Sequence, residues 1–83
     1  MRIIMGILIG NREHEALKVQ ELLTMYGCYI KTRLGLHDTS VEGMCSSKGL
    51  LILEFLPGSE AEINAFEDEL KKLESIVVRR MEF

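Results

Sequence analysis

The sequence predicts an α+β domain in which two helices cover one face of a four-stranded antiparallel sheet, in the chain order β-α-β-β-α-β. Two continuous apolar runs, at residues 3–9 and 50–56, are typical of strands at the centre of a sheet. Two other segments repeat apolar residues at three- and four-residue spacing, as helices with one buried side do. The remaining segments, at residues 29–36 and 75–81, carry charges that suit sheet edges.

Length and charge narrow the class of protein. The 83 residues predict one domain spanning residues 1–83, near the size at which a single core gives only marginal stability. The apolar runs are too short to cross a bilayer and no signal-peptide pattern follows Met1, so we expect a cytoplasmic protein without a membrane partner. The net charge of −3 argues against direct nucleic-acid binding by the chain as a whole. The sequence carries no catalytic signature, so we expect neither an enzyme nor a cofactor.

The first strand is predicted over residues 3–9, and a helix over residues 12–26 follows it. Asn11 is expected to cap this helix, with acidic residues in the first turn where the helix dipole favours negative charge. Gly27 is expected to end the helix in the left-handed conformation.

The middle of the chain predicts two paired strands. Residues 29–36 alternate apolar and polar side chains, residues 37–47 are predicted to be a loop, and residues 50–56 form the second central strand. Pro57-Gly58 stops that strand, and Ser59 with Glu62 predicts a capping box at the start of the second helix.

Right-handed crossovers convert this order into a ferredoxin-like split βαβ sandwich, with the last, first, third and second strands side by side. The last strand is predicted over residues 75–81. The two helices should bury Val19, Leu23, Phe66 and Leu70 together.

The central strands are apolar on both faces, whereas the helices cover only one. If the helices cover Ile4, Leu8, Leu51, Leu53 and Phe55, the other face keeps Ile3, Met5, Ile7, Leu50 and Ile52, and the opposite facing of either strand leaves the same problem. Monomers rarely expose such a patch. We therefore expect a homo-oligomer, either a dimer or a tetramer, with sheets stacked face to face or with edges joined into a continuous sheet.

The turn Gly10-Asn11-Arg12 is a candidate ligand site. It lies between a central strand and a helix N-terminus, where free backbone N–H groups and the helix dipole can hold an anion or a small effector. The alternative is a plain capped turn, because the sequence lacks the glycine pattern and the lysine of phosphate-binding loops.

His14, His37 and Cys45 are candidate metal ligands, because the first helical turn and the long loop leave the sheet at the same end. Their spacing matches no compact metal signature, and exposed polar residues are the preferred interpretation. Cys28 and Cys45 lie at opposite ends of a strand, about 25 Å apart at 3.3 Å per residue. This separation argues against an internal disulfide.

A resemblance to a known family adds to this interpretation. The segments NRE at 11–13, KVQELL at 18–23, YGCYI at 26–30 and RLGL at 33–36 resemble small proteins described as iron-only hydrogenase system regulators. That family is related to ACT-type ligand-binding domains and to the C-terminal domain of nickel-responsive regulators. The resemblance implies an oligomeric regulatory or sensing module that binds an effector near the first strand–helix turn and lacks a DNA-binding element of its own.

Three functions stay open at this point. The first is an oligomeric regulatory or effector-binding module, and the second is a structural protein–protein interaction domain without a ligand. The third is a small metal-binding protein that uses His14, His37 and Cys45.

Overall fold

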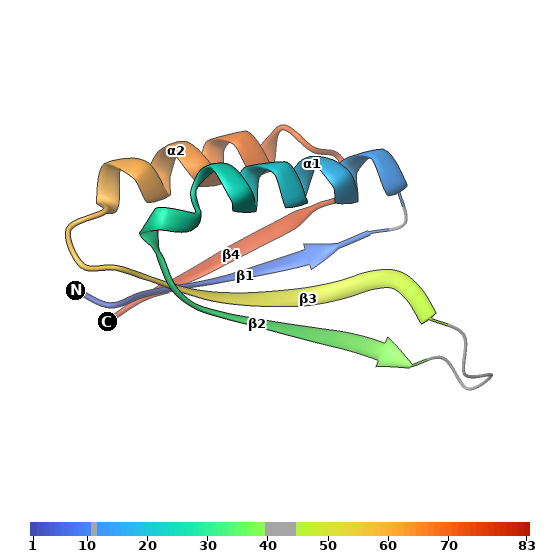
Figure 1. The fold of residues 1–83 in the computed structure, drawn as a ribbon, viewed down its shortest axis with the longest axis horizontal. Coiled ribbons are helices and arrows are strands. Elements are labelled where there is room, and N and C mark those ends of the chain that lie inside the picture. The colour runs from blue at the N-terminus through green and yellow to red at the C-terminus, as the bar shows by residue number, and fades with distance from the viewer. Residues whose placement is uncertain (11, 40–44) are drawn as a thin grey trace.

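A computed structural model describes residues 1–10, 12–39 and 45–83 (Figure 1). The elements are β1 (Ile3–Ile9), α1 (Glu13–Met25), the 3-10 turn η1 (Gly27–Tyr29), β2 (Ile30–Thr39), β3 (Cys45–Phe55), α2 (Glu60–Lys71) and β4 (Val77–Glu82). The strands form one antiparallel sheet in the order β2-β3-β1-β4. The predicted ferredoxin-like topology is confirmed.

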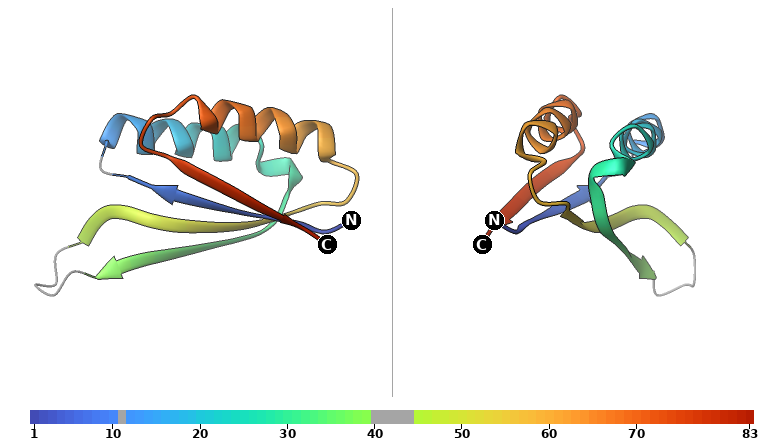
Figure 2. Two further views of the ribbon diagram at one scale, coloured as in Figure 1. Left: turned by 180° about the vertical axis from the view of Figure 1, so that it is seen from behind. Right: turned by 60° about the vertical axis from the view of Figure 1, so that its left-hand side comes forward.

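Both helices lie on the same side of the sheet, as the two views of Figure 2 show. In the described part of the chain, the opposite side of the sheet carries no helix. The chain ends meet at one end of the sheet, where Arg2 and Phe83 exchange backbone hydrogen bonds of 3.1 and 2.8 Å. No helix in the described ranges is long and apolar enough to cross a membrane.

The core lies between the helices and the sheet. Val19, Leu23, Phe66 and Leu70 are all buried in it, which confirms the predicted contact between the helices. The Phe66 ring is central, because its centroid lies 5.2 Å from that of Tyr26 and 5.9 Å from that of Phe55. Aromatic pairs at these separations add to the free energy gained from burial alone.

The side of β1 that faces the helices is not the side that was assumed when the interface was predicted. Ile3, Met5 and Ile7 are buried under the helices, so their assignment to the uncovered face is wrong. The register explains their position: Met5 pairs with Leu53, and Ile7 pairs with Leu51. Directly opposed residues share a face of the sheet, so these side chains follow the buried positions of β3.

The predicted helix caps also differ from the observed ones. Asn11 lies outside the described residues, and the N-cap position of α1 is Arg12, which makes no side-chain cap. Gly27 belongs to η1, and Gly58 is the one described residue with a positive φ, so the left-handed assignment of Gly27 is wrong. The capping box at Ser59 does not form, because its ψ of 22° departs from the extended backbone that an N-cap side chain needs.

The hairpin of β2 and β3 is longer than predicted. The pairing continues past residue 36 through His37 opposite Gly49 and Thr39 opposite Cys45. Residues 37–39 and 45–47 therefore belong to strands instead of the predicted loop. Their polar side chains hid the strands from the sequence pattern, because backbone pairing does not need apolar residues.

Candidate functional site

The turn predicted to hold a ligand packs against the segment that joins α2 to β4. A Cβ atom added at Gly10 would lie 2.7 Å from the carbonyl oxygen of Ser75 and 2.9 Å from its Cβ atom. The Arg12 guanidinium forms an ion pair of 2.7 Å with Glu74. Ser75 thus blocks the position of a side chain at Gly10, a cavity of about 410 Å³ lies on another side of Gly10, and Arg12 already has an anionic partner.

Glu15 links the first turn of α1 through hydrogen bonds to the segment that joins α2 to β4. Its buried carboxylate accepts hydrogen bonds from the backbone N–H groups of Glu74 at 2.9 Å and Ser75 at 2.8 Å, and from the Ser75 hydroxyl. The hydroxyl contact is the main reason that the pKa of Glu15 is lowered from its ordinary value. The first turn of α1 therefore carries the negative charge of Glu15 near the helix N-terminus, where we expected an anion to bind.

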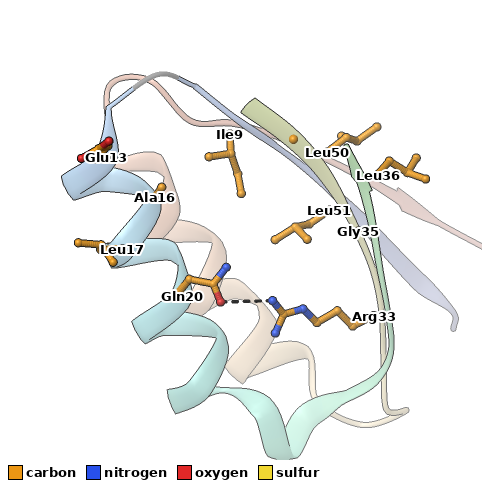
Figure 3. A pocket seen from close by; sticks show the side chains of 11 residues that line it. Ile9, Glu13, Ala16, Leu17, Gln20, Arg33, Gly35, Leu36, Leu50 and Leu51 are labelled. Carbon is orange, nitrogen blue, oxygen red and sulfur yellow. Dashed lines mark hydrogen bonds between the residues drawn. The ribbon is translucent and has the colours of Figure 1, made fainter. Parts of the chain in front are cut away.

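A groove lies between α1 and the strands β2 and β3 (Figure 3). We call it the α1–β2 groove, and its volume is about 510 Å³. Most of its lining is apolar, and the polar side chains are Glu13, Gln20 and Arg33. The described residues that line it are Ile9, Glu13, Ala16, Leu17, Gln20, Arg33, Gly35, Leu36, Gly49, Leu50 and Leu51.

Two glycines help to leave the groove open. Gly35 pairs with the buried Leu51, and Gly49 pairs with the buried Ile9, so both glycines occupy positions that face the helices. Side chains at such positions fill the space below a helix elsewhere in the sheet. Here neither residue has one, and the space beside α1 stays empty.

Arg33 reaches across the groove toward α1. Figure 3 shows its side chain extending from β2 toward Gln20, and its Nη2 atom donates to the Gln20 Oε1 atom at 3.3 Å. Among the described residues, no carboxylate lies within ion-pair distance of Arg33. A guanidinium bonded only to a neutral amide retains donors for an anion.

The side of the sheet without helices carries mostly apolar side chains, with the charged residues Glu54 and Arg79 among them. We call it the open face, and the register assigns it apolar residues from all four strands: Ile4, Leu8, Leu34, Leu36, Leu50, Ile52, Val77 and Met81. Five of these side chains keep between 41% and 55% of their surface exposed: Leu8, Leu34, Leu36, Val77 and Met81. Leu50 and Ile52 lie on this face, as one of the two predicted facings requires.

The two neighbouring arginines of β4 point to opposite sides. Arg79 pairs with Gly6 on the open face, whereas Arg80 faces the helices, donates to Asn64 and forms an ion pair with the buried Glu67. The two cations therefore belong to separate surfaces.

The metal candidates are described only in part. His14 is exposed near the start of α1, and the side chains of His37 and Cys45 lie outside the described set. Within the residues that can be searched, no group of three potential metal ligands occurs. Cys28 is a free, exposed thiol in η1.

Sequence reasoning missed the α1–β2 groove. Its signals are Gly35 and Gly49, which interrupt strands otherwise filled with larger side chains, and Leu17, which lies off the buried side of α1 with 65% of its surface exposed. Two glycines indicate an unfilled space beneath a helix only if both face the helices. The register that shows this comes from the structure and not from the sequence.

No protein-family model and no curated protein matches the chain. Solved structures match it in fold. An uncharacterized protein from Thermotoga maritima is 21% identical with a TM-score of 0.73, over 96% of this chain and 92% of that one. The protein CPII from Thiomonas intermedia K12, solved with ADP, AMP and acetate, is 16% identical with a TM-score of 0.59, over 95% and 82%. At these identities the matches show the ferredoxin-like fold alone.

Two further matches have the same fold. A dimeric ferredoxin-like protein of unknown function from Thermobifida fusca is 12% identical with a TM-score of 0.54, over 100% of this chain and 92% of that one. A formyltetrahydrofolate deformylase from Pseudomonas putida KT2440 is 15% identical with a TM-score of 0.57, over 99% of this chain but 29% of the deformylase. The hydrogenase system regulator family inferred from the resemblance stays a prediction.

Proposed function

We propose that the chain is a small homo-oligomeric regulatory module that senses a small-molecule effector and is not an enzyme. The open face carries the proposal. It presents apolar side chains from every strand of the sheet, and monomers rarely keep a contiguous patch of this kind exposed.

A second copy of the same chain is the partner that we propose for the open face. An open sheet face can stack on an identical face about a two-fold axis, and each copy then contributes the same apolar residues. The face carries Arg79 opposite Gly6, and toward one end it carries Glu54, which the Arg2 guanidinium contacts at 2.8 and 2.9 Å. Stacking would bury Glu54 together with its base, whereas Arg79, which has no carboxylate within ion-pair distance among the described residues, would add a desolvation cost. The dimeric state of the Thermobifida fusca protein with this fold supports the proposal.

The effector-sensing part rests on the α1–β2 groove and on the resemblance to ACT-like regulators. The groove combines an apolar lining with a cation that has no carboxylate partner among the described residues, a combination typical of small-molecule sites. The CPII protein, which shares the fold, was solved with small ligands bound. Membership of the ACT-like superfamily and a role beside a hydrogenase system are parts of this proposal.

Sedimentation equilibrium between 1 and 100 micromolar total protein, a range of about two decades suited to common dimer affinities, tests the assembly. We expect a dimer or a tetramer, and a monomer across the range would contradict the proposal. A thermal-shift screen of small metabolites tests sensing, because a ligand that binds only the folded state raises the melting temperature. An oligomer that responds to no compound in the screen would favour the alternative function, a structural interaction domain without a ligand.

A further inference from the structure

We propose that the α1–β2 groove binds a small organic monocarboxylate that has an apolar body and no amino group beside the carboxylate. Arg33 holds the carboxylate, and the apolar lining takes the body. This inference rests on the proposed function, because it names the class of effector.

The size and lining of the groove fit such a ligand. A volume of about 510 Å³ falls within the range of about 300–1,000 Å³ typical of small-molecule pockets. Ala16 and Leu17 line it from α1, and Leu51 lines it from β3. An aromatic ring or a short aliphatic chain would bury apolar surface against these three side chains.

The charged side chains of the groove favour a ligand with a single carboxylate. A guanidinium can bind a carboxylate through two parallel hydrogen bonds, and Arg33 now uses a single 3.3 Å contact to a neutral amide. Glu13 lines the groove seven residues before Gln20, which is about 10 Å away at 1.5 Å per helical residue. Its negative charge opposes a second anionic group on the ligand, so dicarboxylates fit poorly.

The same arrangement disfavours α-amino acids. In an α-amino acid the ammonium is attached next to the carboxylate, so a carboxylate held by Arg33 brings a second cation close to the guanidinium. Among the described residues that line the groove, the neighbouring acceptor is the Gln20 Oε1 atom, which already accepts from Arg33. Removing the amino group removes this repulsion.

Isothermal titration calorimetry with 3-phenylpropanoate as the probe tests the inference. L-Phenylalanine and 3-phenylpropan-1-ol are the matched comparisons, because the first adds the amino group and the second removes the charge. We expect the unmodified protein to bind 3-phenylpropanoate at least about tenfold more tightly than 3-phenylpropan-1-ol, since a hydrogen bond to a charged group is worth that much or more. It should also bind 3-phenylpropanoate more tightly than L-phenylalanine, because the ammonium of the amino acid is repelled by the guanidinium.

Three variants locate the site. Arg33→Gln removes the cation and should raise the Kd for 3-phenylpropanoate at least about tenfold. Gly35→Val fills the groove from a strand position where φ is not positive, so it should abolish binding while the protein stays folded. Lys31→Gln removes a positive charge from the same strand outside the groove lining, and it should leave the Kd within about twofold of the unmodified value.

The inference is overturned if 3-phenylpropanoate does not bind at millimolar concentration, if L-phenylalanine binds equally well, or if binding survives both Arg33→Gln and Gly35→Val. Sedimentation of the same samples separates this failure from that of the proposed function. A stable oligomer without carboxylate binding overturns the ligand assignment alone, whereas a monomer overturns the proposed assembly.

Discussion

Substituting Leu34 by lysine tests the open face at one defined side chain. Leu34 lies opposite Ile52, and 53% of its surface is exposed in the single chain. Full burial of a leucine contributes about 1.5–3 kcal/mol, so burying the exposed half in a dimer contributes about 0.8–1.5 kcal/mol per copy. A symmetric interface contains the residue twice. The substitution therefore removes about 1.5–3 kcal/mol of association free energy, before any cost of desolvating lysine.

This loss raises the dissociation constant of the dimer about 10- to 150-fold, because about 1.4 kcal/mol corresponds to tenfold. Sedimentation velocity over a concentration series measures the shift, and far-UV circular dichroism checks that the fold is kept. Met25→Lys is the matched control, because Met25 is 67% exposed on α1 and does not belong to the open face. It should leave the dissociation constant unchanged.

In contrast to Leu34→Lys, the substitution Ile7→Lys should affect folding and not association. Ile7 has 0% exposure beneath the helices, so lysine there should unfold the chain instead of separating folded copies. The reasoning is refuted if Leu34→Lys and Met25→Lys leave the same oligomer, or if Ile7→Lys yields a folded monomer. The first result would place the interface elsewhere, and the second would mean that the facing of β1 is wrong.

Three further predictions concern stability, each measured by denaturant or thermal unfolding. The hydrogen bonds that lower the pKa of Glu15 stabilise the folded state above the ordinary carboxyl pKa of 4.5, and this stability is lost as the pH falls through the lower folded value. Glu15→Gln should therefore destabilise the protein near neutral pH and weaken the pH dependence of unfolding below pH 4.5; an unchanged acid transition would contradict this. Gly10→Ala should cost about 1–3 kcal/mol through its clash with Ser75. The control Gly27→Ala, whose added Cβ meets nothing within 4 Å, should be neutral or stabilising, and equal losses in the two variants would refute the clash. Leu70→Ala should cost about 2–5 kcal/mol from the core, and a loss below about 1 kcal/mol would contradict its burial.

The topology could be predicted because local signals agreed with one another. The apolar runs marked the central strands, the helical spacing marked α1 and α2, and the connection rules left one arrangement of four strands. The buried contact of Phe66 and Leu70 with α1 followed from that arrangement.

The facing of β1 could not be predicted from its own residues. The segment is apolar at every position except Gly6, so it lacks the alternation that normally identifies the buried face. Gly6 occupies a position on the open face, because it pairs with Ile52 and Arg79. Only the register with β3 decides between the two facings.

The surroundings of the predicted turn depend on contacts between distant parts of the chain. Gly10 and Glu15 were visible in the sequence as a strand end and a helix start, but Ser75 fills the space beside them from the far side of α2. No local pattern links residues 60 positions apart. The α1–β2 groove was missed for a related reason, because it depends on side chains that are absent at Gly35 and Gly49.

Leu36 and Leu50 connect the two surfaces on which the proposals rest. Both line the α1–β2 groove, and the register also assigns both to the open face. A ligand in the groove and a second copy on the open face would therefore lie against the same two residues, from opposite sides of the sheet. If the ligand changes the affinity between copies by some factor, assembly must change the affinity for the ligand by the same factor. Leu36 stays 47% exposed in the single chain, so a second copy on the open face can contact it. If both proposed partners bind, Leu36 and Leu50 are the residues at which effector binding and assembly would meet.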